Sequence, residues 1–173
     1  MNNTLVFGGN GFLGSYVVEE LLSRKYNVTV ADISSSNVNN SVKFIKVDIS
    51  SDKDLEKVFS KNFDFVFNLA GLADLDKAID NPVKSFQLNT ISNLKILFGC
   101  VSSGVKQFVY ASSAYAASKK GSFYGISKLT SEKIIEEFNK KYGLNYTILR
   151  YGSVYSDRSF ENNYIYNLIE KIY

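Results

Sequence analysis

Short apolar runs alternate with segments of helical periodicity along almost the whole chain, and this alternation constrains the fold more than any other feature. A strand followed by a helix, repeated, predicts crossover connections and a parallel sheet with helices on both faces. The apolar run Phe65-Val66-Phe67 agrees, because it is typical of a strand buried on both sides. We therefore expect an α/β fold with a doubly wound parallel sheet of about six or more strands. The predicted strands are 4–7, 27–31, 42–47, 64–69, 106–112 and 145–149, and the predicted helices are 12–22, 51–59, 81–103, 122–142 and 164–172.

The composition excludes several kinds of chemistry. The 173 residues include no histidine, which rules out a Ser-His-Asp triad, a Cys-His pair and a zinc site with histidine ligands, and we expect no metal site. Acid–base chemistry would have to use Tyr, Lys, Asp or Glu. A net charge of +3 with interspersed signs predicts no nucleic-acid partner. Because the chain has no membrane-spanning apolar run, no secretory signal and one cysteine, Cys100, we expect a cytoplasmic protein without a membrane partner.

A glycine-rich turn joins the first predicted strand to the first predicted helix. Gly8, Gly11 and Gly14 form a G-x-x-G-x-x-G pattern. Phe12 and Leu13, which lie between the last two of these glycines, begin the predicted helix. Glycine takes a tight turn and lets backbone approach a pyrophosphate, and a helix N-terminus offers free N–H groups to the phosphates. This context predicts the phosphate-binding turn of a Rossmann fold. The alternative is a glycine-rich turn that binds no ligand.

Polar and small residues end the next three predicted strands. Asp32 ends the second strand, where a carboxylate accepts hydrogen bonds from the adenosine ribose and repels a 2′-phosphate. No arginine is adjacent, so the sequence favours NAD over NADP; the alternative is an ordinary solvated acid. Asp48 ends the third strand, where it would meet the adenine amino group. The segment 68–71 ends the fourth strand, and its small residues let backbone lie against a cofactor.

Tyr124 and Lys128 are four residues apart on one predicted helix and therefore share a face. A free tyrosine has a pKa of about 10, but a neighbouring ammonium and a positive nicotinamide ring both favour the phenolate. Ser113 lies just after the fifth strand, where its hydroxyl would hydrogen-bond a substrate oxygen beside the tyrosine. Taken alone, the pair could equally be a core aromatic residue and a solvated lysine. Together with the glycine turn, it predicts a catalytic set.

These residues together resemble the extended short-chain dehydrogenase/reductase family over essentially the whole chain. Within it they are most similar to NAD-dependent nucleotide-sugar epimerases and dehydratases of the UDP-glucose 4-epimerase type. The motifs that carry the resemblance are Gly8 to Gly14, Asp32, Asp48-Ile49, Asn68-Leu69-Ala70-Gly71, Asn89, Ser112-Ser113, Tyr124 to Leu129 and Leu149 to Tyr155.

The resemblance implies a role for each matching position. Tyr124 would take the proton of a sugar hydroxyl as hydride moves to NAD, while Lys128 holds the nicotinamide ribose and tunes the tyrosine. Ser113 would orient the sugar oxygen, Asn89 would support the site, and Tyr151 would line the nicotinamide side of the cleft. The cofactor contacts implied elsewhere are Gly8, Gly11, Phe12, Leu13, Gly14, Asp32, Asp48, Ile49, Leu69, Ala70 and Gly71.

The chain departs from the family in two ways. Only ten residues separate Ser113 from Tyr124, so the loop over the substrate is reduced. Family members also continue into a C-terminal substrate domain and are roughly twice as long. We therefore expect an NAD-binding domain at 1–160 and the start of a truncated or absent substrate domain at 161–173, in a chain that is either a fragment or a naturally short member. Such a chain should bind NAD but turn over nucleotide sugars poorly.

Several alternatives stay open on the sequence. Relatives that act as dehydratases usually place acidic residues after the catalytic serine, whereas Ala114 and Tyr115 stand here, which favours an epimerase or a simple oxidoreductase. The chain could be a reductase or dehydrogenase of another carbonyl substrate, or a non-enzymatic NAD-binding module. The sequence does not name the sugar.

The predicted helix at 82–103 carries more apolar residues than one stripe against a sheet needs. Relatives pair this helix and the one at 122–142 across a two-fold axis, so we expect a homodimer. The alternative is a fully buried crossover helix. The apolar residues concerned are Phe86, Leu88, Ile91, Leu94, Ile96, Leu97 and Phe98.

Overall fold

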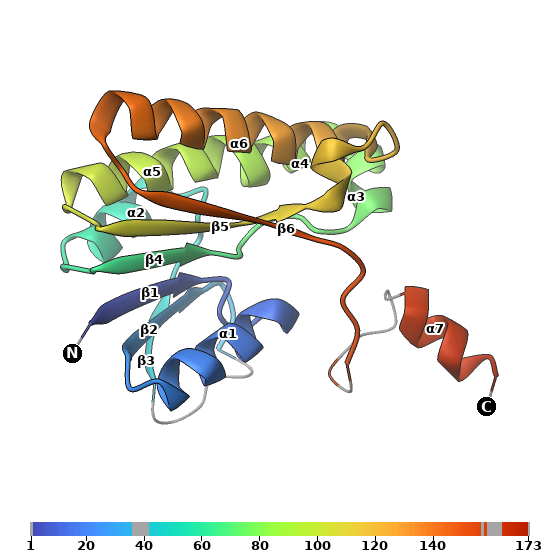
Figure 1. Cartoon of the computed structure of the whole chain (residues 1–173), viewed down its shortest axis with the longest axis horizontal. Helices are drawn as coiled ribbons and strands as arrows, with labels where there is room; N and C mark the ends of the chain where they lie inside the picture. Colours follow the sequence, from blue (N-terminus) through green and yellow to red (C-terminus); the bar gives the residue numbers. More distant parts are fainter. Residues whose placement is uncertain (1, 36–41, 157, 159–163, 173) are drawn as a thin grey trace.

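The computed structural model, which describes residues 2–35, 42–156, 158 and 164–172, shows a six-stranded sheet in the order β3-β2-β1-β4-β5-β6 (Figure 1). Every neighbouring pair of strands is parallel. The α/β fold and the parallel sheet predicted from the alternation are therefore confirmed. The strands are β1 (Asn3–Phe7), β2 (Asn27–Asp32), β3 (Lys43–Lys46), β4 (Phe65–Asn68), β5 (Gln107–Ser113) and β6 (Tyr146–Tyr151).

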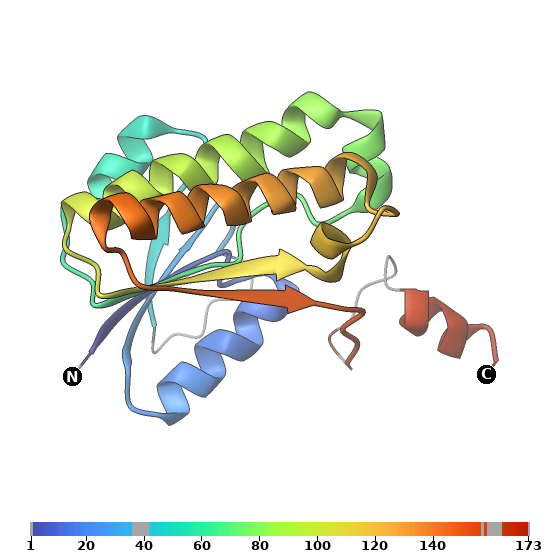
Figure 2. The ribbon, with the colours of Figure 1, turned by 45° about the horizontal axis from the view of Figure 1, so that its top comes forward.

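Helices cover the two faces of the sheet unequally (Figures 1 and 2). One face carries α2 (Asp52–Phe59), α4 (Pro82–Phe86), α5 (Ser92–Ser102) and α6 (Ser122–Tyr142). The other face carries α1 (Phe12–Ser23), which lies under the β1–β3 half. The short helix α3 (Leu75–Asp80) lies near the start of α6, and α7 (Tyr164–Glu170) lies apart from the sheet in both views.

Local capping accounts for several helix boundaries. Asn81 accepts a hydrogen bond from the backbone N–H of Lys84 at the start of α4, and Gly143 ends α6 at a φ of 71°. The Ser51 side chain accepts a hydrogen bond from the Asp54 backbone N–H at the start of α2, and the Asp54 carboxylate accepts one from the backbone N–H of Asp48.

The long helix predicted at 81–103 is interrupted. A π-helical turn (Gln87–Ile91) separates α4 from α5, and two hydrogen bonds join it to α6. Ser131 Oγ donates to the Asn89 carbonyl at 2.7 Å, while Thr90 Oγ1 donates back to the Ser127 carbonyl. These partners lie about forty residues away along the chain, so local periodicity did not reveal the turn. Helix α3 was also not predicted.

The main hydrophobic core lies between the sheet and α2, α5 and α6, and a smaller one lies under α1. Ile96 and Leu97 are fully buried in the main core, so they are not surface residues as the dimer prediction assumed. Phe98 and Ile91 stay 49% and 41% exposed. The crossover helix is therefore only partly buried, and some but not all of its apolar side chains are exposed to solvent.

Candidate active site

The main candidate site is a cleft of about 350 Å³ at the carboxyl ends of the strands. The strand order reverses between β1 and β4, which is where open α/β sheets bind ligands. The walls are formed by the end of β2, by the segments that follow β1, β2, β3 and β4, by α4 and by the π-helical turn. The lining residues are Gly8, Gly11, Ala31, Asp32, Ile33, Val47, Asp48, Ile49, Leu69, Ala70, Gly71, Lys84 and Leu88.

Close backbone packing explains the glycines of the turn. A Cβ on Gly14 would lie 2.0 Å from the Gly8 carbonyl oxygen, and a Cβ on Gly8 would lie 2.7 Å from the Ala70 nitrogen. Gly8 also has a φ of +73°, which favours glycine. Helix α1 begins after Gly11, and among the described residues no side chain forms a capping hydrogen bond at its first turn. Its first N–H groups are therefore available to an anion.

The Asp32 carboxylate links β2 to the glycine turn. Its Oδ2 accepts a hydrogen bond from the Asn10 backbone N–H at 3.0 Å, and its Oδ1 accepts from the Ser34 N–H at 3.3 Å. Asp32 also lines the cleft. The same carboxylate therefore orders the turn and presents a negative charge to a ligand.

Eight of the predicted cofactor residues line the cleft: Gly8, Gly11, Asp32, Asp48, Ile49, Leu69, Ala70 and Gly71. Phe12, Leu13 and Gly14 form the adjoining first turn of α1. Asn89 and Lys128 lie next to Gly71, since a Cβ there would be 2.5 Å from Asn89 Oδ1 and 3.9 Å from Lys128 Nζ. Tyr151 ends β6, paired in register with Ser113, and is not part of the cleft wall.

Lys84 and Leu88 line the cleft but were not predicted from the sequence motifs. They are four positions apart across α4 and the π-helical turn, a spacing that would have placed them on one face. Hydrogen bonds from Ser50 hold the pKa of Asp48 below its usual range, and the charge of Lys84 adds to this effect. The cleft therefore contains a carboxylate and an ammonium at its β3 end.

Ser113, Tyr124 and Lys128 lie together at the other end of the site. Tyr124 is buried and is hydrogen-bonded to Ser113. Lys128 Nζ donates to the Ala111 carbonyl at 2.9 Å and lies 5.9 Å from the centre of the Tyr124 ring. The predicted catalytic set is thus brought together by β5 and one face of α6.

The pKa values correct one expectation. Burial raises the pKa of Tyr124 above its ordinary value, and the hydrogen bond with Ser113 only partly offsets this. Burial also lowers the pKa of Lys128 to about 8, although Glu132 acts in the opposite direction. In the free chain the neutral phenol is therefore favoured, because the burial of Tyr124 outweighs the groups that favour its phenolate.

Asn89 holds the segment after β4 in place. Its Oδ1 accepts from the Leu72 N–H at 2.8 Å, and its Nδ2 donates to the Leu72 carbonyl and to Ser127 Oγ, both at 3.0 Å. The side chain is 1% exposed. Asn89 thus connects the cleft wall at Gly71 to the helix that carries Tyr124 and Lys128.

Residues 4–173 match the sequence model of the NAD-dependent epimerase/dehydratase family. The chain belongs to this family. It is 32% identical over 173 aligned positions to a putative UDP-glucose 4-epimerase of Methanocaldococcus jannaschii, covering 89% of this chain and 56% of that protein. The predicted family resemblance is confirmed.

Solved structures of family members agree. The UDP-glucose 4-epimerase of Thermus thermophilus in complex with NAD has a TM-score of 0.89 and 30% identity, covering 98% of this chain and 62% of that one. The enzyme of Thermotoga maritima with UDP-glucose has a TM-score of 0.85 and 34% identity, covering 91% and 58%. This family member therefore spans little more than half the length of the relatives it matches.

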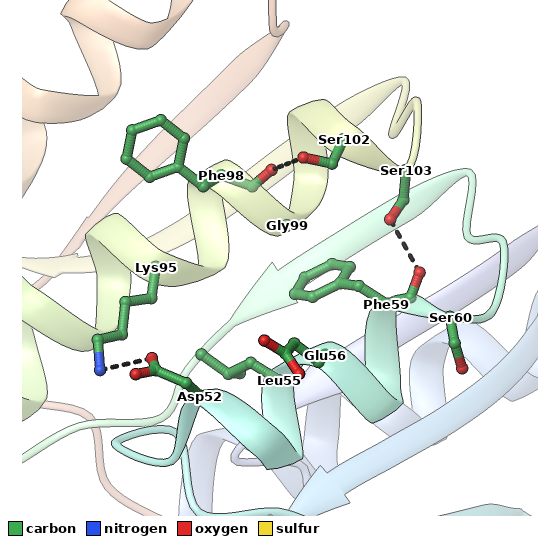
Figure 3. A pocket seen from close by; sticks show the side chains of 10 residues that line it. All are labelled: Asp52, Leu55, Glu56, Phe59, Ser60, Lys95, Phe98, Gly99, Ser102 and Ser103. Carbon is green, nitrogen blue, oxygen red and sulfur yellow. Dashed lines mark hydrogen bonds and ion pairs between the residues drawn. The ribbon is translucent and has the colours of Figure 1, made fainter.

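A larger hollow of this family member lies away from the site (Figure 3). It has a volume of about 510 Å³ between α2 and α5, with Phe59 and Phe98 on its walls and a Lys95–Asp52 ion pair at 2.7 Å. It contains none of the predicted site residues.

Within the described residues, no helix is long and apolar enough to cross a membrane, and no group of three or more His, Cys, Asp or Glu could hold a metal ion.

Proposed function

We propose that this chain is the NAD-binding part of a nucleotide-sugar epimerase that uses Tyr124 as its base. The observation that carries the proposal is the position of Lys128. Its Nζ lies beside Gly71 in the cleft wall and beside the Tyr124 ring at once. A nicotinamide at the Gly71 end of the cleft would therefore meet the Ser113–Tyr124–Lys128 set.

The cleft residues fit NAD. The glycine turn leaves no room for a Cβ at Gly14 or Gly8, and the uncapped start of α1 offers N–H groups to the pyrophosphate. Asp32 would accept hydrogen bonds from the adenosine ribose hydroxyls, and its charge would repel the 2′-phosphate of NADP. Asp48, at the β3 end, would receive the adenine amino group.

The other cofactor contacts follow from the same placement. Ile49 and Leu69 would pack on the adenine side, Phe12 and Leu13 would present backbone N–H groups, and Tyr151 would face the nicotinamide side from β6. Ala70 and Gly71 would let backbone lie against the cofactor.

NAD held by these residues would supply the acceptor, and later the donor, of the sugar carbon's hydride. The chain's own residues would control the accompanying proton. Ser113 Oγ would hydrogen-bond the sugar hydroxyl, and Tyr124 Oη would remove its proton and later return it. Because the pKa of Tyr124 is raised in the free chain, its phenolate would form only when the positive charge of the cofactor adds to that of Lys128.

An epimerase fits better than a dehydratase because Ala114 and Tyr115 follow Ser113 in the 3-10 turn (Ala114–Ala117), where no carboxylate stands beside the serine. The relatives named above are UDP-glucose 4-epimerases. We therefore propose a nucleotide-sugar substrate. Residues 1–160 would form the NAD-binding domain, and 161–173 would begin a substrate domain. Of that second segment the structure describes 164–172.

The test has two readouts. Calorimetry should show that the chain binds NAD more tightly than NADP. A single-turnover assay with UDP-, GDP- and dTDP-sugars should then detect slow reduction of bound NAD, because the chain spans little more than half of its relatives' length. Tyr124→Phe should lower that rate about 10²- to 10⁴-fold while NAD affinity stays the same. Equal rates in the two proteins would refute the assignment of the base, and fast multiple turnover would refute the expected weakness of this chain.

We also propose a homodimer formed by the helices at 82–103 and 122–142. Val83, Ile91 and Phe98 are exposed on the first segment, and Phe123, Ile126 and Leu129 are exposed on α6. Val83, Ile91 and Phe123 line one shallow hollow, so exposed apolar side chains of the two segments lie together there. The buried, unpaired Cys100 supports a reducing, cytoplasmic location, which cell fractionation would test.

A further inference from the structure

One buried carboxylate joins the three elements that carry the catalytic end of the site. Glu132 of α6 is 2% exposed. Its Oε1 accepts hydrogen bonds from Ser112 Oγ at 2.5 Å and Arg150 Nε at 2.9 Å, and its Oε2 accepts from Arg150 Nη2 at 2.6 Å. Ser112 and Arg150 are register partners in β5 and β6. The carboxylate therefore clamps α6 onto two neighbouring strands at one register position.

Each member of this clamp is close in sequence to a residue of the proposed site. Ser112 precedes Ser113, and Arg150 precedes Tyr151, so the next register pair on the two strands belongs to the site. Glu132 follows Lys128 by one helical turn and Tyr124 by two, on the same face of α6. A change at the clamp would therefore shift the proposed catalytic groups relative to one another.

The charge of Glu132 also acts on Lys128, which lies one helical turn before it on α6. The ammonium of Lys128 faces neutral groups on the other elements packed around it: the Ala111 carbonyl and the Tyr110 ring on β5, and Asn89 beside Gly71. On α6 it faces Tyr124 and Glu132. Burial lowers the pKa of Lys128, and the Glu132 charge opposes that effect.

The charge of Glu132 is itself maintained by its partners. Burial would raise the pKa of Glu132, but the hydrogen bonds from Arg150 and Ser112 and the charges of Arg150 and Lys133 outweigh burial and hold the pKa below its usual value. The Arg150 side chain is 47% exposed, so solvent can stabilise its positive charge. The carboxylate is therefore ionised where Lys128 needs a counter-charge.

We propose that Glu132 is a positioning residue, whose clamped carboxylate keeps Lys128 in its ammonium form and holds Tyr124 and Ser113 in register. The inference rests on the proposed function of the Tyr124–Lys128 pair. The simpler alternative is an ion pair that only stabilises the fold. A positioning role and a purely structural role predict different effects of clamp variants on the pH at which Lys128 titrates.

The test is an NMR titration of the lysine side chains in the free chain between pH 7 and 10, with the Lys128 signal assigned by its loss in Lys128→Met. Glu132→Gln removes the charge and keeps the shape, so Lys128 should titrate at lower pH. Arg150→Met removes a positive charge, while the Glu132 carboxylate stays ionised because the titration range lies well above the ordinary pKa of a carboxyl group, so Lys128 should titrate at higher pH. Glu136→Gln is the matched control, because Glu136 lies one turn further along α6 and pairs with Lys133 at the surface.

Opposite shifts in the two variants support the proposal, since a purely structural ion pair would move both in the same direction or neither. Coinciding titrations in the native chain and Glu132→Gln would overturn it, as would shifts of the same sign. If Glu132→Gln does not fold, Arg150→Met alone decides, by the sign of its shift. Glu132→Asp, which keeps the charge, should restore titration toward the native pH.

A second readout separates this inference from the proposed function. NAD affinity should weaken as the pH rises through the pKa of Lys128, about 8, and in Glu132→Gln this weakening should begin at lower pH. If the native chain shows no such alkaline loss of NAD affinity, the role of Lys128 at the cofactor is wrong. The lysine titration in the free chain would still decide whether Glu132 controls the charge.

Discussion

The proposed site has two parts: the cleft at the ends of β1–β4, which is the proposed dinucleotide end, and the group of residues on β5, β6 and α6, which is the proposed catalytic end. Backbone dominates the first part and side chains dominate the second. At the dinucleotide end, backbone makes most of the contacts: Gly8 and Gly14 pack against neighbouring main chain, and helix α1 starts uncapped. At the catalytic end, side chains from three elements meet, and two of them, Lys128 and Glu132, are buried charges.

The first part of the site therefore depends mainly on shape, and the second depends mainly on electrostatics. A turn made of close backbone contacts tolerates no added atom, but it is insensitive to pH near neutrality. A site made of buried charges tolerates small changes of shape but depends on protonation, because burial penalises each charge unless a partner offsets it.

The largest effect is expected at the glycine turn. In Gly14→Ala the new Cβ would lie 2.0 Å from the Gly8 carbonyl oxygen, so the turn must move. Strain of about 1–3 kcal/mol is typical of such overpacking, and NAD affinity should fall roughly ten- to a hundredfold. Calorimetry and thermal melts measure both quantities. Gly152→Ala is the control, since a Cβ there meets nothing within 4 Å; similar losses in the two variants would contradict the steric argument.

At the catalytic end, Lys128→Met should stabilise the chain while removing a proposed cofactor contact. The folded-state pKa is about 8 and the ordinary value is 10.5, so the unfolded chain binds more protons between these values. The free energy of unfolding of the native chain should therefore rise from pH 8 to 10.5, and this rise should vanish in Lys128→Met. At pH 7 the variant should be more stable by up to roughly 3 kcal/mol, less the lost hydrogen bond to Ala111. Denaturant unfolding at several pH values measures this, and parallel pH curves for the two proteins would show that Lys128 is not the buried titrating group.

A smaller effect is expected from Asp32→Ala, which changes the charge at the dinucleotide end. NAD affinity should fall about tenfold, because the ribose and the Asn10 N–H each lose an ionised acceptor, and the preference over NADP should narrow. Calorimetry with both cofactors measures the ratio. Asp52→Asn, at an exposed carboxylate outside the cleft, serves as the control. An unchanged NAD-to-NADP ratio in Asp32→Ala would mean that this carboxylate does not select the cofactor.

The smallest effect on the site is expected from Ile126→Glu, on the outer face of α6. Ile126 is 53% exposed, so stability and NAD affinity should change little. The charge should weaken the proposed homodimer, because it would be buried without a partner on association. Light scattering at high micromolar concentration should show a dimer for the native chain and a monomer for the variant. A native chain that stays monomeric there would argue against the interface.

Sequence reasoning succeeded where the information is local. The bounds of α6 at 122–142 and the four-residue spacing of Tyr124 and Lys128 were predicted because both depend on helical periodicity. The strand-turn-helix context of Gly8 to Gly14 likewise predicted the cleft. The sequence did not predict the π-helical turn, the place of Lys84 in the cleft or the burial of Ile96 and Leu97. These features depend on contacts with residues that are distant along the chain.

The sequence alone therefore determined the parallel sheet, the glycine turn and the chemistry available at the site. These features depend on hydrophobic periodicity and on the backbone freedom of glycine, which act over only a few neighbouring residues. The tertiary structure decided how that chemistry is tuned. Register pairing of Ser112 with Arg150 places two donors under Glu132, and helix packing buries Lys128 beside it. A pKa depends on burial and on the charges within a few ångströms, and these distances exist only once β5, β6 and α6 have packed together.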